Sequence, residues 1–73
     1  MDRTRAMEHL AEAERHIAEG EDRIRHQLRI IEDLERDGHD SALARQLLDT
    51  LKRTHTLHIK QREFIIEELK SFR

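Results

Sequence analysis

Histidines are the residues of this chain best suited to chemistry, and two of them are spaced to act together. The 73-residue sequence holds six histidines, and His55 and His58 stand at i and i+3, on one face of a helix. Glu21 could reach the same point from the other half of the chain. Two imidazoles and one carboxylate form a donor set for Zn²⁺. Glu21, His55 and His58 are the candidate metal ligands, but helical pairs of histidines arise easily, and we expect no metal and no other cofactor.

A structural role explains the same residues more simply. His58 falls where the interface between two helices should be driest, and a polar group at such a position often fixes the register of the pair at a cost in stability. Gly20, without a side chain, would leave room for the imidazole. We therefore favour a polar layer that sets register, with these members: His16, Glu21, His58 and Arg62.

Nothing in the sequence indicates catalysis. There is no cysteine, and the two serines, Ser41 and Ser71, fall at expected helix ends, where capping or fraying accounts for them. A hairpin of this size has no pocket of useful volume. We expect a protein that is not an enzyme and has no catalytic residues.

The elements that position these residues are two long helices. Charged residues make up 41% of the chain, there is no proline, and the only glycines are Gly20 and Gly38. Gly38 suits the left-handed position that ends a helix. We predict an all-α single domain, an antiparallel helical hairpin or coiled coil, with helix one over about 3–37, a turn over about 38–40 and helix two over about 41–72. The residues suited to cap the two helix starts are Asp2, Thr4, Asp40 and Ser41.

Heptad spacing predicts which residues lie between the helices. With the turn near Gly38, facing residues have numbers that add up to about 78, which places His58 opposite Gly20 and Leu47 opposite Ile31. The first helix carries a bulky series and a mostly small companion series: Leu10, Ile17, Ile24 and Ile31, with Ala6, Ala13, Gly20, Gln27 and Leu34. The second helix is predicted to contribute Leu47, Leu51, Thr54, His58, Ile65, Leu69 and Phe72.

Helix two has more apolar surface than one partner helix can cover. Its apolar residues span roughly 220° of the helical wheel, whereas a surface helix needs a stripe of roughly 100°. Residues on the flanks recur at i and i+7, which argues against random scatter. We predict a homo-oligomer, with a dimer favoured, in which two hairpins pair into a four-helix bundle; a larger protein partner is the other option. The predicted interface residues are Leu57, Ile59, Phe64 and Ile66.

The charge pattern argues against nucleic acid and membranes as partners. The net charge is −2, with −4 over residues 1–37 and +2 over residues 38–73. This asymmetry favours folding one half onto the other, and the bases of helix two are interrupted by acids without aromatic residues for stacking. The chain begins without a signal peptide-like apolar run and holds no segment long enough to span a bilayer. We therefore expect a cytoplasmic protein.

Two strings resemble a group of short uncharacterised bacterial helical-hairpin proteins: HIAEGEDRI, from His16 to Ile24, and IIEDLERDGHD, from Ile30 to Asp40. The shared pattern is H-x-A-E-G-E followed by L-E-x-D-G-H-D, and it covers most of the chain. The resemblance implies a hairpin fold and a complete small protein, and it carries over no activity. The further residues that match are Ala44, Leu47, Leu48, His58, Arg62 and Leu69, whereas Gln61 departs from an aspartate common in the group.

The sequence thus favours a small non-enzymatic module for protein–protein interaction or structure, which self-associates through helix two. The alternative is a small ligand or metal sensor that uses the central His/Glu layer. A nucleic-acid-binding accessory protein is the weaker alternative.

Overall fold

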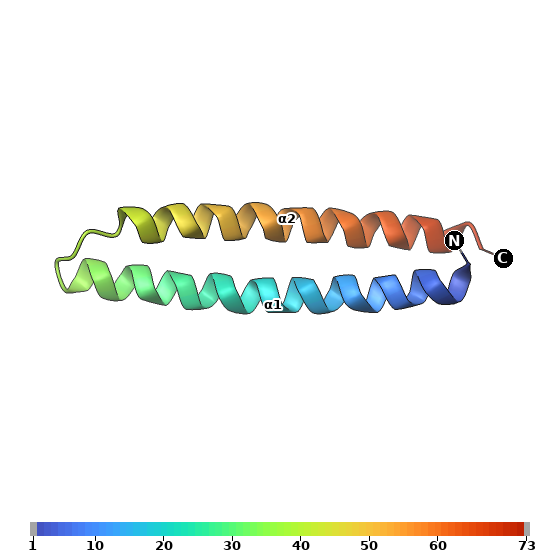
Figure 1. Ribbon diagram of the computed structural model, residues 1–73, viewed down its shortest axis with the longest axis horizontal. Helices are drawn as coiled ribbons and strands as arrows, with labels where there is room; N and C mark the ends of the chain where they lie inside the picture. Colours follow the sequence, from blue (N-terminus) through green and yellow to red (C-terminus); the bar gives the residue numbers. More distant parts are fainter. Residues whose placement is uncertain (1, 73) are drawn as a thin grey trace.

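The computed structural model describes residues 2–72, which form two long antiparallel helices (Figure 1). Helix α1 spans Arg3–Arg36 and helix α2 spans Ala42–Lys70. The hairpin measures 58 × 14 × 13 Å, and the part of the chain described here contains no strand. The all-α hairpin fold is confirmed, with helix bounds one or two residues inside the predicted ones at three of the four ends. Over the same residues, neither helix has the length and apolar character needed to cross a membrane.

The turn is specified by Gly38 at the end of α1. Gly38 has φ +77°, a left-handed backbone conformation that residues with a side chain rarely adopt. The amide of His39 donates to the carbonyl oxygen of Leu34 at 2.8 Å, and the amide of Gly38 donates to that of Glu35 at 3.2 Å. These two bonds form a Schellman motif, which satisfies carbonyl groups that the helix end leaves free.

Aspartates cap the starts of both helices. The Asp2 carboxylate accepts a hydrogen bond from the amide of Arg5 at 2.7 Å, as expected for an N-cap residue. Before α2, the Asp40 carboxylate accepts from the amide of Ala42 at 2.9 Å. Ser41 makes no capping bond with its side chain, and its hydroxyl donates to Glu35 instead, at 2.8 Å. Asp2 and Asp40 are therefore the capping residues among those predicted.

The side of α1 that packs on α2 is the predicted one. Its residues recur at alternating spacings of four and three, the pattern of a coiled-coil seam. Every member is buried or half-buried: Ala6, Leu10, Ala13, Ile17, Gly20, Ile24, Gln27, Ile31 and Leu34.

The side of α2 that packs on α1 differs from the prediction at several positions. Leu47 and Thr54 are exposed, whereas Leu48, His55 and Arg62 are buried or half-buried. The prediction took His58 as the middle of the packed side, whereas the packed side is centred between the His55 and His58 positions. Leu48 and His55 therefore lie in the seam in place of Leu47 and Thr54. The packed residues are Ala44, Leu48, Leu51, His55, His58, Arg62, Ile65, Leu69 and Phe72, which we call the inner stripe of α2.

The register between the helices also differs from the predicted one. Gly20 lies against His55, not His58. The reason lies in the connection, because residues 37–41 turn back along the end of α1 before α2 begins (Figure 1). Facing residues therefore have numbers that add up to about 75, as for Gly20 and His55, and not to about 78. The register that places Gly20 opposite His55 places Ala13 opposite Arg62, a small residue opposite a large one.

Candidate functional site

The closest approach of the two helices near the middle of the hairpin involves Gly20 and His55. A Cβ atom placed on Gly20 would lie 2.8 Å from Nδ1 of His55, closer than side chains normally approach. The imidazole occupies the space that a side chain on α1 would otherwise fill. This is the role that the sequence suggested for His58, transferred by one helical turn to His55.

His58 packs instead on His16. The two imidazole rings have centroids 5.1 Å apart and are tilted by 35°. Within residues 2–72, Nδ1 of His55 and Nδ1 of His58 are both buried and lack a hydrogen-bond partner. A buried polar atom without a partner costs about 1–3 kcal/mol. Polar groups in a helix interface generally bring such a cost where they select one alignment.

An open recess lies beside the histidine layer. Its volume is about 130 Å³, and its lining residues are His9, Glu12, His16 and Gln61. Pockets for small molecules generally measure about 300–1,000 Å³ and are mostly apolar. The recess is smaller and more polar than such a site.

The candidate metal ligands do not come together in the hairpin. Glu21 is exposed, whereas His55 and His58 are half-buried in the seam. Across residues 2–72, the structure brings no three His, Cys, Asp or Glu side chains into an arrangement suited to a metal ion. Arg62 is half-buried in the seam, and within the described residues neither Arg62 nor Glu21 forms an ion pair. The layer thus consists of His16, His55, His58 and Arg62, and Glu21 lies outside it.

Two polar contacts that link the helices were not predicted from the sequence. The Gln27 side chain is buried and donates from Nε2 to the carbonyl oxygen of Ala44 at 2.9 Å. Near the turn, the Arg45 guanidinium donates to the Glu35 carboxylate, from Nε at 2.9 Å and also from Nη2. The hydrogen bonds from Arg45 and Ser41 lower the pKa of the Glu35 carboxyl below its usual value. Both contacts help to fix the start of α2 against α1.

A second stripe with heptad spacing runs along the exposed surface of α2. Each of its residues immediately precedes an inner-stripe residue, so the two stripes lie about 100° apart around the helix. Its apolar members are well exposed, with 80% of Leu43, 49% of Leu47, 64% of Leu57 and 66% of Phe64 accessible. We call this set the outer stripe, and all of its members are exposed: Leu43, Leu47, Thr50, Thr54, Leu57, Gln61, Phe64 and Glu68.

The predicted interface residues fall on both flanks of α2. Leu57 and Phe64 belong to the outer stripe, whereas Ile59 and Ile66 lie on the opposite flank. Ile59 is half-buried and Ile66 is 36% exposed, so α1 partly covers this second flank. The outer stripe is therefore the larger of the two uncovered apolar surfaces, and the sequence analysis missed Leu43 and Leu47 as members of it. Their spacing of four and three from the neighbouring members is the signal that could have identified them.

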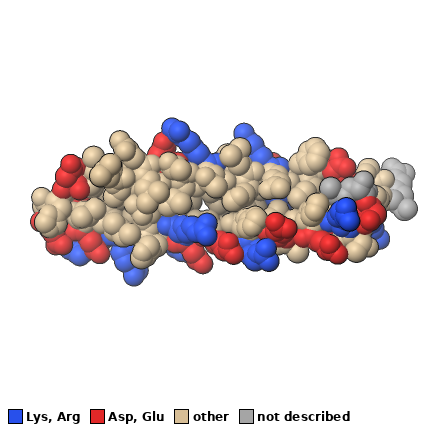
Figure 2. Space-filling view, viewed as in Figure 1, with Lys and Arg blue, Asp and Glu red and all other residues tan. Residues whose placement is uncertain are grey.

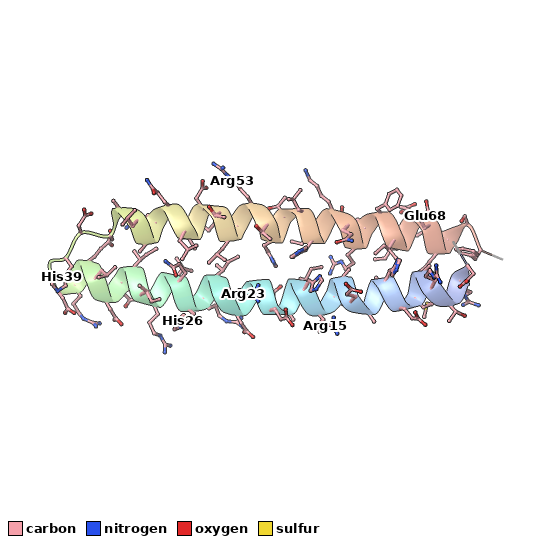
Figure 3. The ribbon with its side chains drawn as sticks, viewed as in Figure 1. Arg15, Arg23, His26, His39, Arg53 and Glu68 are labelled. Atoms are coloured by element: carbon pink, nitrogen blue, oxygen red, sulfur yellow. The ribbon has the colours of Figure 1, made fainter. Side chains whose placement is uncertain are left out.

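Charged side chains lie mainly on the outside of the hairpin. On the face shown in Figure 2, uncharged side chains cover much of α2, whereas acidic and basic side chains crowd the α1 edge. Figure 3 shows Arg15 and His26 pointing away from α2, and Arg53 pointing away from α1. Arg53 pairs with Asp49 at 2.7 Å, so an acidic side chain balances this base of α2. On the face shown, the basic side chains of residues 2–72 do not form a continuous track.

Three features of the hairpin could serve a function: the histidine layer in the seam, the polar recess beside it and the uncovered outer stripe on α2. The chain matches no protein-family model, no curated protein and no solved structure.

Proposed function

We propose that this protein is a small non-enzymatic interaction module whose hairpin self-associates through the outer stripe of α2. Two hairpins form a dimer, and their four helices form a bundle. The observation that carries the proposal is the heptad spacing of the outer stripe, because this spacing is what a second helix recognises.

The position of the outer stripe around α2 supports a bundle. It lies about 100° from the inner stripe, since each outer residue immediately precedes an inner one. In a four-helix bundle, the two helices that contact a given helix lie about 90° apart around its axis. One stripe of α2 can therefore bind α1 while the other binds a helix of the second chain. Each Leu or Phe that becomes buried contributes about 1.5–3 kcal/mol.

The alternative function, a ligand or metal sensor built on the histidine layer, has less support. The layer lies inside the seam, and its neighbouring recess is small. Within residues 2–72 no three candidate ligands converge on one point. The cytoplasmic location and the relationship to short bacterial hairpin proteins remain predictions from the sequence.

The test is sedimentation of the full chain and of two double variants that add the same charge. Leu57→Lys with Phe64→Lys places two lysines in the outer stripe. Gln46→Lys with Thr56→Lys is the matched control, because both residues are exposed and lie outside the two stripes. We expect a dimer for the parent and the control at tens of micromolar, and a dissociation constant at least about a hundredfold higher for the stripe variant.

Each outcome decides the proposal. A parent that is monomeric, with a melting temperature unchanged on dilution, refutes it, because association must make the melting temperature depend on concentration. A stripe variant that stays dimeric like the control also refutes it. A stripe variant that loses both its dimer and its helix content, while the control keeps both, supports it and shows that folding and assembly are coupled.

A further inference from the structure

The outer stripe has a pattern along its length that determines how it can pair with itself. Its large residues are Leu43 and Leu47 near the start of α2 and Leu57 and Phe64 in its second half. The intervening positions are polar. A stripe with this pattern has one alignment in which Leu47, Leu57 and Phe64 all lie over the partner's α2.

We propose that α2 pairs with α2 of a second chain in antiparallel orientation, in the register that places Thr50 opposite the partner's Gln61. This inference rests on the proposed function and adds the identity and alignment of the partner helix. In this register Leu47 lies opposite the partner's Phe64, and Thr54 lies opposite the partner's Leu57. The two α2 helices then overlap along their whole length, and a twofold axis crosses them between residues 55 and 56.

Shifting the pair by one heptad in either direction removes a large apolar residue from the contact with the partner's α2. One shift places Thr50 opposite the partner's Thr54 and moves Phe64 beyond the start of the partner's α2. The other shift places Thr54 opposite the partner's Phe64 and leaves Leu47 without a facing residue on α2. Burial of apolar side chains therefore favours the first register, since the helices can cover Leu47, Leu57 and Phe64 together only there.

The charges of α1 select the same register independently. With the alignment of α1 on α2 fixed by Gly20 and His55, the two α1 helices also run antiparallel on the same side of the dimer. The residues that immediately precede the seam residues of α1 then face the partner's α1. Arg5 lies within one residue of Asp33 of the partner and Glu12 within one residue of His26 of the partner, twice each, and His16 lies level with Arg23 of the partner. Glu19 meets its own copy at the axis.

Either heptad shift separates Arg5 from Asp33 of the partner and adds a repulsive pair. One brings Glu12 level with Asp33 of the partner, and the other brings Glu12 level with Glu19 of the partner. The like-charge contact at Glu19 in the favoured register is offset within each chain, because Arg15 pairs with Glu19 at 3.9 Å. Charge complementarity and apolar matching thus identify a second copy of this chain as the occupant of the outer stripe.

Disulfide cross-linking tests the register, because the chain contains no cysteine of its own. Thr50→Cys and Gln61→Cys chains are mixed under reducing conditions, exchanged and then oxidised mildly. A disulfide requires Cα atoms within about 7 Å. In the proposed register the mixed pair satisfies this limit, whereas two Thr50→Cys chains are offset by eleven residues, about 16 Å. The mixture should cross-link at least about tenfold faster than either single variant.

The controls separate this inference from the proposed function. Thr50→Cys mixed with Thr54→Cys reports the shifted register, and Thr50→Cys alone reports parallel pairing. Preferential cross-linking in either control, in a protein with a dimeric mass, overturns the register and leaves self-association intact. A dimer that cross-links in none of these mixtures overturns the proposed register. A parent chain that is monomeric refutes the proposed function and, with it, the register.

Discussion

The contact between Gly20 and His55 allows a quantitative prediction about Gly20→Ala. Alanine is more favourable than glycine inside a helix by about 0.8–1.0 kcal/mol, so an unopposed substitution should stabilise the protein by that amount. The added methyl carbon, however, would lie 2.8 Å from Nδ1 of His55. An ordinary contact is about 3.4 Å or more, and moving the ring into a packed seam typically costs about 1–3 kcal/mol. The net effect should lie between no change and a loss of about 2 kcal/mol.

A double-mutant cycle isolates the contact. Gly20→Ala is introduced into the parent, into His55→Ala and into His58→Ala, and the free energy of unfolding is measured with urea at one fixed protein concentration. In the His55→Ala background the clash disappears, so Gly20→Ala should give the full gain of about 1 kcal/mol. The coupling energy between Gly20 and His55 should therefore be about 1–3 kcal/mol, and that between Gly20 and His58 should be small.

The cycle can refute the reasoning in two ways. If Gly20→Ala stabilises the parent by about 1 kcal/mol, Gly20 does not face a packed side chain and the close approach is absent. If the coupling is with His58 and not with His55, the register predicted from the sequence is correct and the one described here is wrong.

Two further predictions follow from the seam and from the turn. Leu48→Ala should lower the free energy of unfolding by about 2–3 kcal/mol at every protein concentration. Leu47→Ala should change the free energy of unfolding by less than about 0.5 kcal/mol in dilute monomer. Urea titrations of both variants at two protein concentrations measure these effects. Hydrogen bonds from Arg45 hold the pKa of Glu35 below its ordinary value of about 4.3, so its contribution is complete above that value and is lost as the pH falls through the lowered pKa. Melting temperatures of the parent and Glu35→Gln should differ slightly at neutral pH and converge in acid, and a difference that grows in acid would contradict this assignment.

The sequence was sufficient to predict the hairpin because its signals are local. Two glycines, one of them followed by capping residues, leave room for only two long helices, and the heptads of α1 are regular over nine positions. The Schellman motif at Gly38 follows from the same local chemistry. Signals of this kind depend on neighbouring residues, so they can be interpreted without knowledge of the tertiary structure.

The inner stripe of α2 and the helix register depend on three-dimensional properties. The sequence-based predictions of both were therefore partly wrong. A helical wheel centred on His58 puts Leu47 inside the seam and Leu48 outside it, whereas the packed side is centred between the His55 and His58 positions. The register depends on how far the connection runs back along α1, which the five connecting residues do not reveal by composition. For this reason Gly20 was placed opposite His58, one turn away from its neighbour His55.

Polar residues lie in the middle of both stripes of α2, and this arrangement explains how a simple heptad sequence selects one alignment. A repeat of apolar residues alone would tolerate sliding by seven residues. In the seam, such a slide would carry His55 from Gly20 to Gln27 or Ala13 and remove the space for its ring. In the proposed dimer, the same slide would remove Phe64 or Leu47 from the contact with the partner's α2. The polar middle of the seam would thus fix the alignment within the hairpin, and the loss of apolar burial would fix the alignment between hairpins.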